Sequence, residues 1–202
     1  MDHVDLAMVL AVDGSASVTY EEFGLIAGGM AAALRDPGVV AGLTRAPVML
    51  SLLLWSGAGA QEVITDWTRI ASAEDLTRFA EGVDNMPRLV RAGQTAIGEA
   101  LLASLTLLAH LPAVTKRSIV NVIGDGRSND GMAPGPVRDR MAAADITING
   151  LCILHEEPDL LQSYTEEVIG GPGAFAVTCR DYPDFAEAMR QKLAREIGDP
   201  IV

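Results

Sequence analysis

The sequence is poor in basic residues and has no long apolar run, and both shortages narrow what the chain can do. Its 15 lysines and arginines stand against 27 acidic residues, so the formal net charge is −12. Nucleic-acid phosphates and anionic membrane surfaces repel such a chain, so we expect neither as a partner. Apolar runs such as 48–55 are far shorter than the roughly 20 residues that span a bilayer, so we expect no membrane insertion.

Cysteine is also scarce, with only Cys152 and Cys179 in the chain. Two buried free thiols agree with this number, and so does one disulfide between neighbouring strand ends, which would indicate an oxidising compartment. The first residues do not resemble an export signal, because Asp2, His3 and Asp5 interrupt the start.

What the chain does contain is enough apolar sequence for a large core. Hydrophobic residues make up 49% of its 202 residues and charged residues 21%. No internal repeat or linker divides it, so we expect one domain over residues 1–202. The Asp36-Pro37-Gly38 stretch reads as a break. Apolar runs predict strands at 4–12, 48–55, 61–67, 117–124, 146–154 and 175–179, and helical spacing predicts helices at 19–34, 73–83, 95–111, 136–144, 158–169 and 184–197.

This alternation predicts an α/β fold with helices on both faces of a six-stranded, mostly parallel, doubly wound sheet. The connection at 56–59 is too short for a crossover helix, so the strand at 61–67 should be an antiparallel edge strand. Right-handed crossovers bring the carboxyl ends of the parallel strands to one edge of the sheet, where ligands bind in such folds.

Oxygen-bearing side chains gather at that predicted edge. Asp13, Ser15 and Ser17 occupy alternate positions directly after the first apolar run, Thr95 opens a long apolar helix, and Asp125 follows another strand. Carboxylate and hydroxyl oxygens are the ligands that hard divalent cations prefer. The five residues therefore predict a metal site, with Mg²⁺ the first choice and Mn²⁺ or Ca²⁺ as alternatives.

Each of these residues also has a plainer interpretation. Asp13 could belong to a turn whose serines cap the next helix, and Asp125 could belong to an ordinary turn. Thr95 is expected to cap its own helix, which would not exclude a metal contact. Asn129 and Asp130 are expected to shape a loop rather than to bind a metal.

The arrangement resembles the metal-ion-dependent adhesion site of von Willebrand factor type A domains, a group that includes the integrin inserted domains. The resemblance extends along nearly the whole chain, and three later stretches are similar to a bacterial branch with no assigned function. These stretches are 146–151, 168–175 and 184–188.

The resemblance implies a Rossmann-like doubly wound sheet and a role for each donor. Ser15 and Ser17 would bind the ion through their hydroxyls, and Thr95 directly or through a water. Asp13 and Asp125 would hold coordinated waters or bind directly. One position would stay open for an acidic side chain of a protein partner. The resemblance also implies export or a periplasmic location, because members of the branch commonly carry an export signal.

Together these observations favour a non-enzymatic, cation-dependent protein-binding module. A metal-dependent phosphohydrolase is an alternative, but an aspartyl-phosphate enzyme would need a second aspartate where this chain has Ser15. A structural assembly subunit, in which the metal only stiffens the loops, is another alternative. The oligomeric state stays open at this level.

Overall fold

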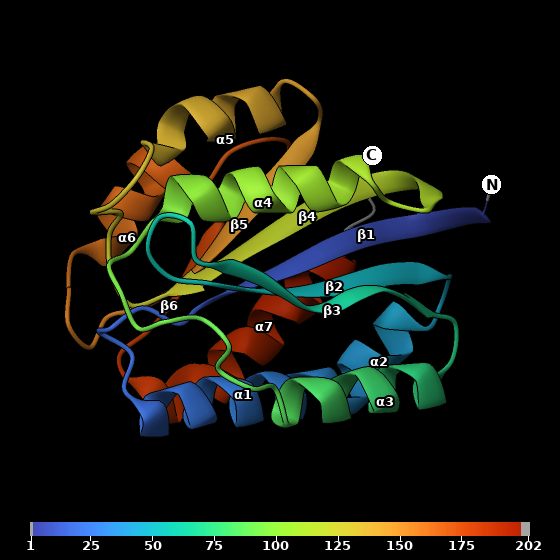
Figure 1. Cartoon of the computed structure of the whole chain (residues 1–202). Coiled ribbons are helices and arrows are strands. Elements are labelled where there is room, and N and C mark those ends of the chain that lie inside the picture. The colour runs from blue at the N-terminus through green and yellow to red at the C-terminus, as the bar shows by residue number, and fades with distance from the viewer. Residues whose placement is uncertain (1, 199–202) are drawn as a thin grey trace.

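A single six-stranded sheet runs through the molecule (Figure 1). The structure is a computed structural model that describes residues 2–198, so the expected domain limits at residues 1 and 202 lie outside it. The strand order is β3-β2-β1-β4-β5-β6, with only β3 antiparallel to its neighbour, as predicted. The strands are β1 (Asp2–Asp13), β2 (Val48–Trp55), β3 (Gln61–Ile70), β4 (Ala113–Gly124), β5 (Ile146–Ile153) and β6 (Ala176–Cys179).

Helices cover both faces of this sheet. In Figure 1, α1, α2, α3 and α7 lie below it, and α4, α5 and α6 lie above it. The doubly wound α/β architecture predicted from the sequence is thereby confirmed. The helices are α1 (Tyr20–Leu34), α2 (Pro37–Leu43), α3 (Ala73–Asp84), α4 (Ile97–Ala109), α5 (Pro134–Ala142), α6 (Leu160–Ser163) and α7 (Phe185–Gly198).

The central strand β1 is buried on both faces from Leu6 onward, which explains why residues 6–12 are an unbroken apolar run. Side chains at alternate positions point to opposite faces of a strand. Met8 and Leu10 therefore belong to the core cluster between the sheet and helices α1 and α7. Val9 and Ala11 belong to the cluster between the sheet and α4. All four are fully buried.

The order of the strands creates the edge where a ligand can bind. The chain leaves β1 for β2 on one side and returns through β4 on the other, so β1 and β4 are neighbours. The carboxyl ends of these two strands form the topological switch point of the sheet, the usual place for a ligand in open α/β folds. Asp13 is the last residue of β1, and Asp125 directly follows β4.

Two helical segments differ from the sequence prediction. Asp36-Pro37-Gly38 does not end a helical region but starts α2: the Asp36 side chain accepts from the backbone N–H groups of Gly38 and Val39. An aspartate cap followed by proline at the first helical position is a helix-start signal. The helix expected at 158–169 consists of the short α6 and a π-helical turn at Tyr164–Val168.

Both cysteines are buried free thiols, so the disulfide alternative is wrong for this structure. Cys179 pairs with Ile153, one residue beyond Cys152, so the two thiols point to opposite faces of the sheet. Each belongs to a different core cluster. Burial is the main cause that raises the pKa of each thiol to about 12.

Between residues 2 and 198, no helix combines the length and the apolar character that crossing a bilayer requires.

Candidate functional site

The loop after β1 and the end of β4 meet through their side chains. The backbone N–H of Ser15 donates to Asp13 Oδ1 over 2.7 Å, and the Ser15 and Ser17 hydroxyl oxygens lie 3.1 Å apart. Ser17 Oγ donates to Asp125 Oδ1 at 2.6 Å, across 108 residues of sequence. The structure therefore brings four of the five predicted donors into one hydrogen-bonded cluster.

Thr95, the fifth predicted donor, lies beside this cluster but does not cap its helix as expected. The first residue before α4 is Ala96, and no side chain at that position makes a capping bond. The backbone N–H of Ile97 donates instead to Ser128 Oγ at 3.3 Å. The Thr95 hydroxyl oxygen lies 3.9 Å from the point where a Cβ on Gly126 would sit. Another loop thus provides the cap, and the Thr95 hydroxyl lies near Gly126, the residue that follows Asp125.

Asn129 shapes the loop, as expected, and ties the β4 loop to the entrance of α4. The backbone N–H of Thr95 donates to Asn129 Oδ1 at 2.8 Å, and the backbone N–H of Asn129 donates to the Thr95 carbonyl at 2.9 Å. Asp130 accepts from the backbone N–H of Ala58 at 2.8 Å, so it too serves loop structure.

The Asp13 carboxylate is the least compensated polar group of the cluster. It is fully buried, and its Oδ2 atom has no hydrogen-bond partner among the described residues. Burial, and then the charge of nearby Asp125, raise the pKa of Asp13 to about 7. A buried carboxylate of this kind is costly unless a cation or a donor compensates it.

Two tyrosines that the sequence analysis did not identify also face the carboxylates. Tyr182 donates from its hydroxyl to Asp125 Oδ2 at 2.8 Å. The Tyr164 hydroxyl is buried without a hydrogen-bond partner, and it would lie 2.8 Å from a Cβ on Gly124. The same Cβ would lie 3.0 Å from Asp13 Oδ2. Burial raises the pKa of both phenols, so both keep their protons at neutral pH.

The loop at 13–17 is fixed from the other side by the segment between α3 and α4. Arg88 donates to the carbonyl oxygens of Gly14 and Ser15 at 3.0 and 2.7 Å. The backbone N–H of Ala16 donates to the Gly93 carbonyl at 2.8 Å. All three donor-bearing loops are therefore linked to one another by hydrogen bonds.

The donors fit a hard divalent cation. Within residues 2–198, His, Cys, Asp and Glu form no group of three or more that could hold a metal ion. A cation at this edge would therefore rely on hydroxyl oxygens beside its two carboxylates. Hydroxyl and carboxylate oxygens suit Mg²⁺, and the unpartnered Asp13 Oδ2 is the buried negative group that a cation would compensate.

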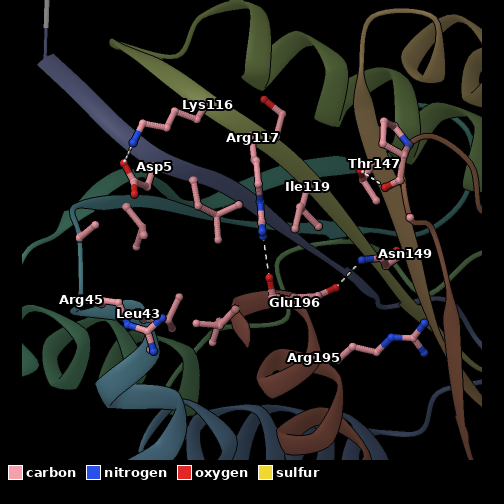
Figure 2. A pocket seen from close by; sticks show the side chains of 18 of the residues that line it. Asp5, Leu43, Arg45, Lys116, Arg117, Ile119, Thr147, Asn149, Arg195 and Glu196 are labelled. Carbon is pink, nitrogen blue, oxygen red and sulfur yellow. Dashed lines mark hydrogen bonds and ion pairs between the residues drawn. The ribbon is translucent and has the colours of Figure 1, made fainter. Parts of the chain in front are cut away.

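A cavity of about 860 Å³ lies at the opposite ends of the strands and does not contain these donors (Figure 2). Lys116 there pairs with Asp5 at 2.8 Å, and Arg117 donates to the Glu196 backbone carbonyl at 2.6 Å. Figure 2 shows Arg117 and Glu196 between Arg45 on one side and Arg195 on the other. The oxygen cluster and this cavity are thus separate features of the fold.

Solved structures with the same fold include von Willebrand factor type A domains. A von Willebrand factor type A protein from Catenulispora acidiphila is 17% identical with a TM-score of 0.67, over 98% of this chain and 44% of that one. Proximal thread matrix protein 1 from the mussel byssus, with a zinc-occupied MIDAS motif, is 16% identical with a TM-score of 0.67, over 98% and 48%. The present chain thus spans less than half the length of either protein.

The vWF domain of the type V pili tip protein Mfa5 from Porphyromonas gingivalis is 11% identical with a TM-score of 0.62, over 96% of this chain and 95% of that one. These likenesses show that the fold is that of von Willebrand factor type A domains. No curated protein matches the chain. The family described as "Protein of unknown function (DUF1194)" matches residues 3–201, and the chain therefore belongs to the DUF1194 family.

Proposed function

We propose that this chain is a non-enzymatic module that binds a protein partner through a divalent cation. The predicted donors would form the site, directly or through coordinated water: Asp13, Ser15, Ser17, Thr95 and Asp125. The observation that carries the proposal is Asp13 Oδ2, a buried carboxylate oxygen without a hydrogen-bond partner, within a cluster of hydroxyls at the switch point of the sheet. A bound cation would compensate the charge of the buried Asp13 carboxylate, whose burial without a partner is otherwise unfavourable.

When bound, the cation would supply a Lewis-acidic point at the surface for an outside oxygen ligand. The serine and threonine hydroxyls are neutral donors, so the two aspartates alone balance the charge of a divalent ion. Few direct carboxylates leave an ion attractive to another anion, which favours an acidic side chain as the partner's contribution. Mg²⁺ is our first choice, and Mn²⁺ and Ca²⁺ accept the same oxygens.

Exposed apolar side chains at the start of α1 and on neighbouring loops support a protein as the partner. Tyr20 is 82% exposed and closely follows Ser17 in sequence. Leu89, 61% exposed, is next to Arg88, which binds the 13–17 loop. Met132 is 40% exposed on the loop that also holds Asn129. A partner that presents an acidic side chain flanked by apolar groups would match this surface.

The solved relatives support the same direction. The mussel protein has a zinc-occupied MIDAS motif, and Mfa5 is a pilus tip protein. We propose a comparable role outside the cytoplasm for this chain. The phosphohydrolase alternative is weaker, because Ser15 stands where an aspartyl-phosphate enzyme would carry its second aspartate.

Isothermal titration calorimetry with MnCl₂ and MgCl₂ tests the proposal. We expect one divalent ion per chain for the wild type and no detectable binding for Asp13→Ala. Asp139→Ala, which removes an exposed carboxylate on α5, is the matched control and should bind like the wild type.

Absence of Mn²⁺ and Mg²⁺ binding by the folded wild type would end the proposal. Equal binding by Asp13→Ala would show that the ion binds at another site. Once a partner is in hand, recovery that is the same with and without EDTA would favour the structural-subunit alternative over the adhesion module.

A further inference from the structure

The Tyr182 hydroxyl binds the Asp125 carboxylate and can therefore determine whether Asp125 contacts the ion directly. This inference rests on the proposed cation-binding function. The tyrosine belongs to a short 3₁₀ turn at Tyr182–Asp184, directly before α7. Its side chain is buried, and its hydroxyl reaches Asp125 across 57 residues of sequence at 2.8 Å. No sequence motif of the predicted site includes it.

Both oxygens of the Asp125 carboxylate are already occupied by protein donors. Oδ1 accepts from Ser17 Oγ at 2.6 Å, and Oδ2 accepts from the Tyr182 hydroxyl at 2.8 Å. The carboxylate of Asp13 differs, because Ser15 N–H binds Oδ1 and Oδ2 has no partner. The two aspartates of the site are therefore not equivalent.

We propose that Tyr182 is a positioning residue that holds Asp125 away from direct contact with the cation. Asp125 then acts through the Ser17 hydroxyl: it accepts the hydrogen bond that Ser17 donates, and this leaves the oxygen lone pairs of Ser17 for the ion. Asp13 is left as the one carboxylate able to bind directly. The ion keeps more of its charge for an anion from outside.

This role predicts changes of opposite sign in Tyr182→Phe. Without the phenol, Asp125 Oδ2 is free to turn and bind the ion directly. Mn²⁺ should then bind about fivefold more tightly, because a carboxylate without a competing hydrogen bond is a better ligand. The loaded protein should bind acetate about fivefold more weakly, because a second direct carboxylate lowers the charge that the ion presents. A merely structural defect would weaken both.

Water-proton relaxation of Mn²⁺-loaded protein provides a separate readout. Direct ligation by Asp125 displaces water from the ion, so Tyr182→Phe should lose about one rapidly exchanging Mn²⁺-bound water. Adding Asp125→Asn to Tyr182→Phe should remove the gain in Mn²⁺ affinity, because the gain depends on that carboxylate. Asp139→Ala, which removes an exposed carboxylate on α5, is the control and should stay within about twofold of the wild type.

The outcomes separate this inference from the proposed function. If the wild type binds no Mn²⁺, the proposed function fails. If the wild type binds Mn²⁺ but Tyr182→Phe binds it equally or more weakly, with unchanged water relaxation, the positioning role is wrong and the cation site stands. Circular dichroism and thermal melting confirm that each variant is folded before it is scored.

Discussion

At the scale of single residues, the crowded point of the site is Gly124, the last residue of β4. Its backbone passes between the Tyr164 hydroxyl and the Asp13 carboxylate, and a Cβ there would lie 2.8 and 3.0 Å from their nearest oxygens. The first distance is shorter than real Cβ atoms show and the second is at the limit, and both side chains are fully buried in close-packed surroundings. Only glycine fits without displacing one of them.

Gly124→Ala should therefore lower the free energy of unfolding by about 1–3 kcal/mol, the usual cost of overfilling a packed interior. Urea unfolding monitored by circular dichroism measures this. Tyr164→Phe in the same chain should restore part of the loss, because it removes one of the two oxygens. Gly82→Ala is the control: its Cβ would meet nothing within 4 Å, and alanine favours a helix, so stability should hold or rise. Equal stability of Gly124→Ala and wild type would refute the crowding.

How much of the site the sequence predicted depends on how far apart its contacts lie in the chain. The Asp13–Ser17 loop is local, and its alternate spacing was visible as a pattern. Tyr182 has no such signal, because it meets Asp125 only after the sheet has formed. The cap of α4 was missed for the same reason, since Ser128 lies 31 residues beyond Ile97. Local patterns predicted the oxygen-bearing side chains that meet at this edge, whereas the groups that bind them are set by tertiary structure.

At the scale of elements, the C-terminal helix α7 is held against the sheet by a buried polar network. Lys192 and Glu196 of α7 pair with each other in the interior, and Lys192 also donates to Asn121 Oδ1. Asn121 and Asn149, on neighbouring strands, donate to the two oxygens of Glu196 at 3.2 and 2.7 Å. Each charged group is thereby compensated, so loss of a single member leaves an unpaired buried charge.

Lys192→Met should lower the free energy of unfolding by about 3–5 kcal/mol, because Glu196 then stays buried without its cation. Urea unfolding provides the measurement. Adding Glu196→Gln should recover most of that loss, because a neutral amide needs no counter-charge. The exposed pair Arg190 and Glu187 on the same helix is the comparison, and Arg190→Met should change stability by about 1 kcal/mol or less. A mild effect of Lys192→Met with no recovery in the double variant would contradict this account.

The elements themselves were mostly predictable, since continuous apolar runs and helical spacing survive into the structure. The exception at α2 is instructive, because Asp36 followed by Pro37 carries the start signal of a helix. Proline and glycine alone favour a break at this point, which is why the pattern did not predict α2. The π-helical turn at Tyr164–Val168 had no counterpart in the pattern, and it places Tyr164 against the site.

At the scale of the whole molecule, the two cysteines report on each face of the sheet separately. Cys179 lies in the core layer between the sheet and helices α1 and α7, and Cys152 lies in the layer between the sheet and helices α4 and α5. The chain was predicted to fold as one domain, and we propose that both layers unfold together. If so, one cooperative unfolding step exposes both thiols, and alkylation of either thiol measures the same step.

We expect both thiols to react with iodoacetamide at the same slow rate in native protein. At both pH 7 and pH 9 the reaction should be far slower than that of an ordinary thiol, because burial raises both pKa values to about 12 and leaves little thiolate. The raised pKa also means that these thiols favour the folded state less as pH rises from about 9 toward 12. Mass spectrometry of timed samples distinguishes the sites. Labelling of one cysteine well before the other would show that the layers open independently.

The reciprocal hydrogen bonds between Thr95 and Asn129 have a mechanical consequence. These bonds join the segment that bears Asp125 to the helix entrance that bears Thr95. Ser17 binds Asp125, and the Ala16 N–H binds the Gly93 carbonyl, so the serine-bearing turn is tied to the same unit. An arriving ion would meet ligands that already stand near their final places, so little ordering remains to oppose capture. We therefore expect the divalent ion to bind rapidly and with a small change in heat capacity.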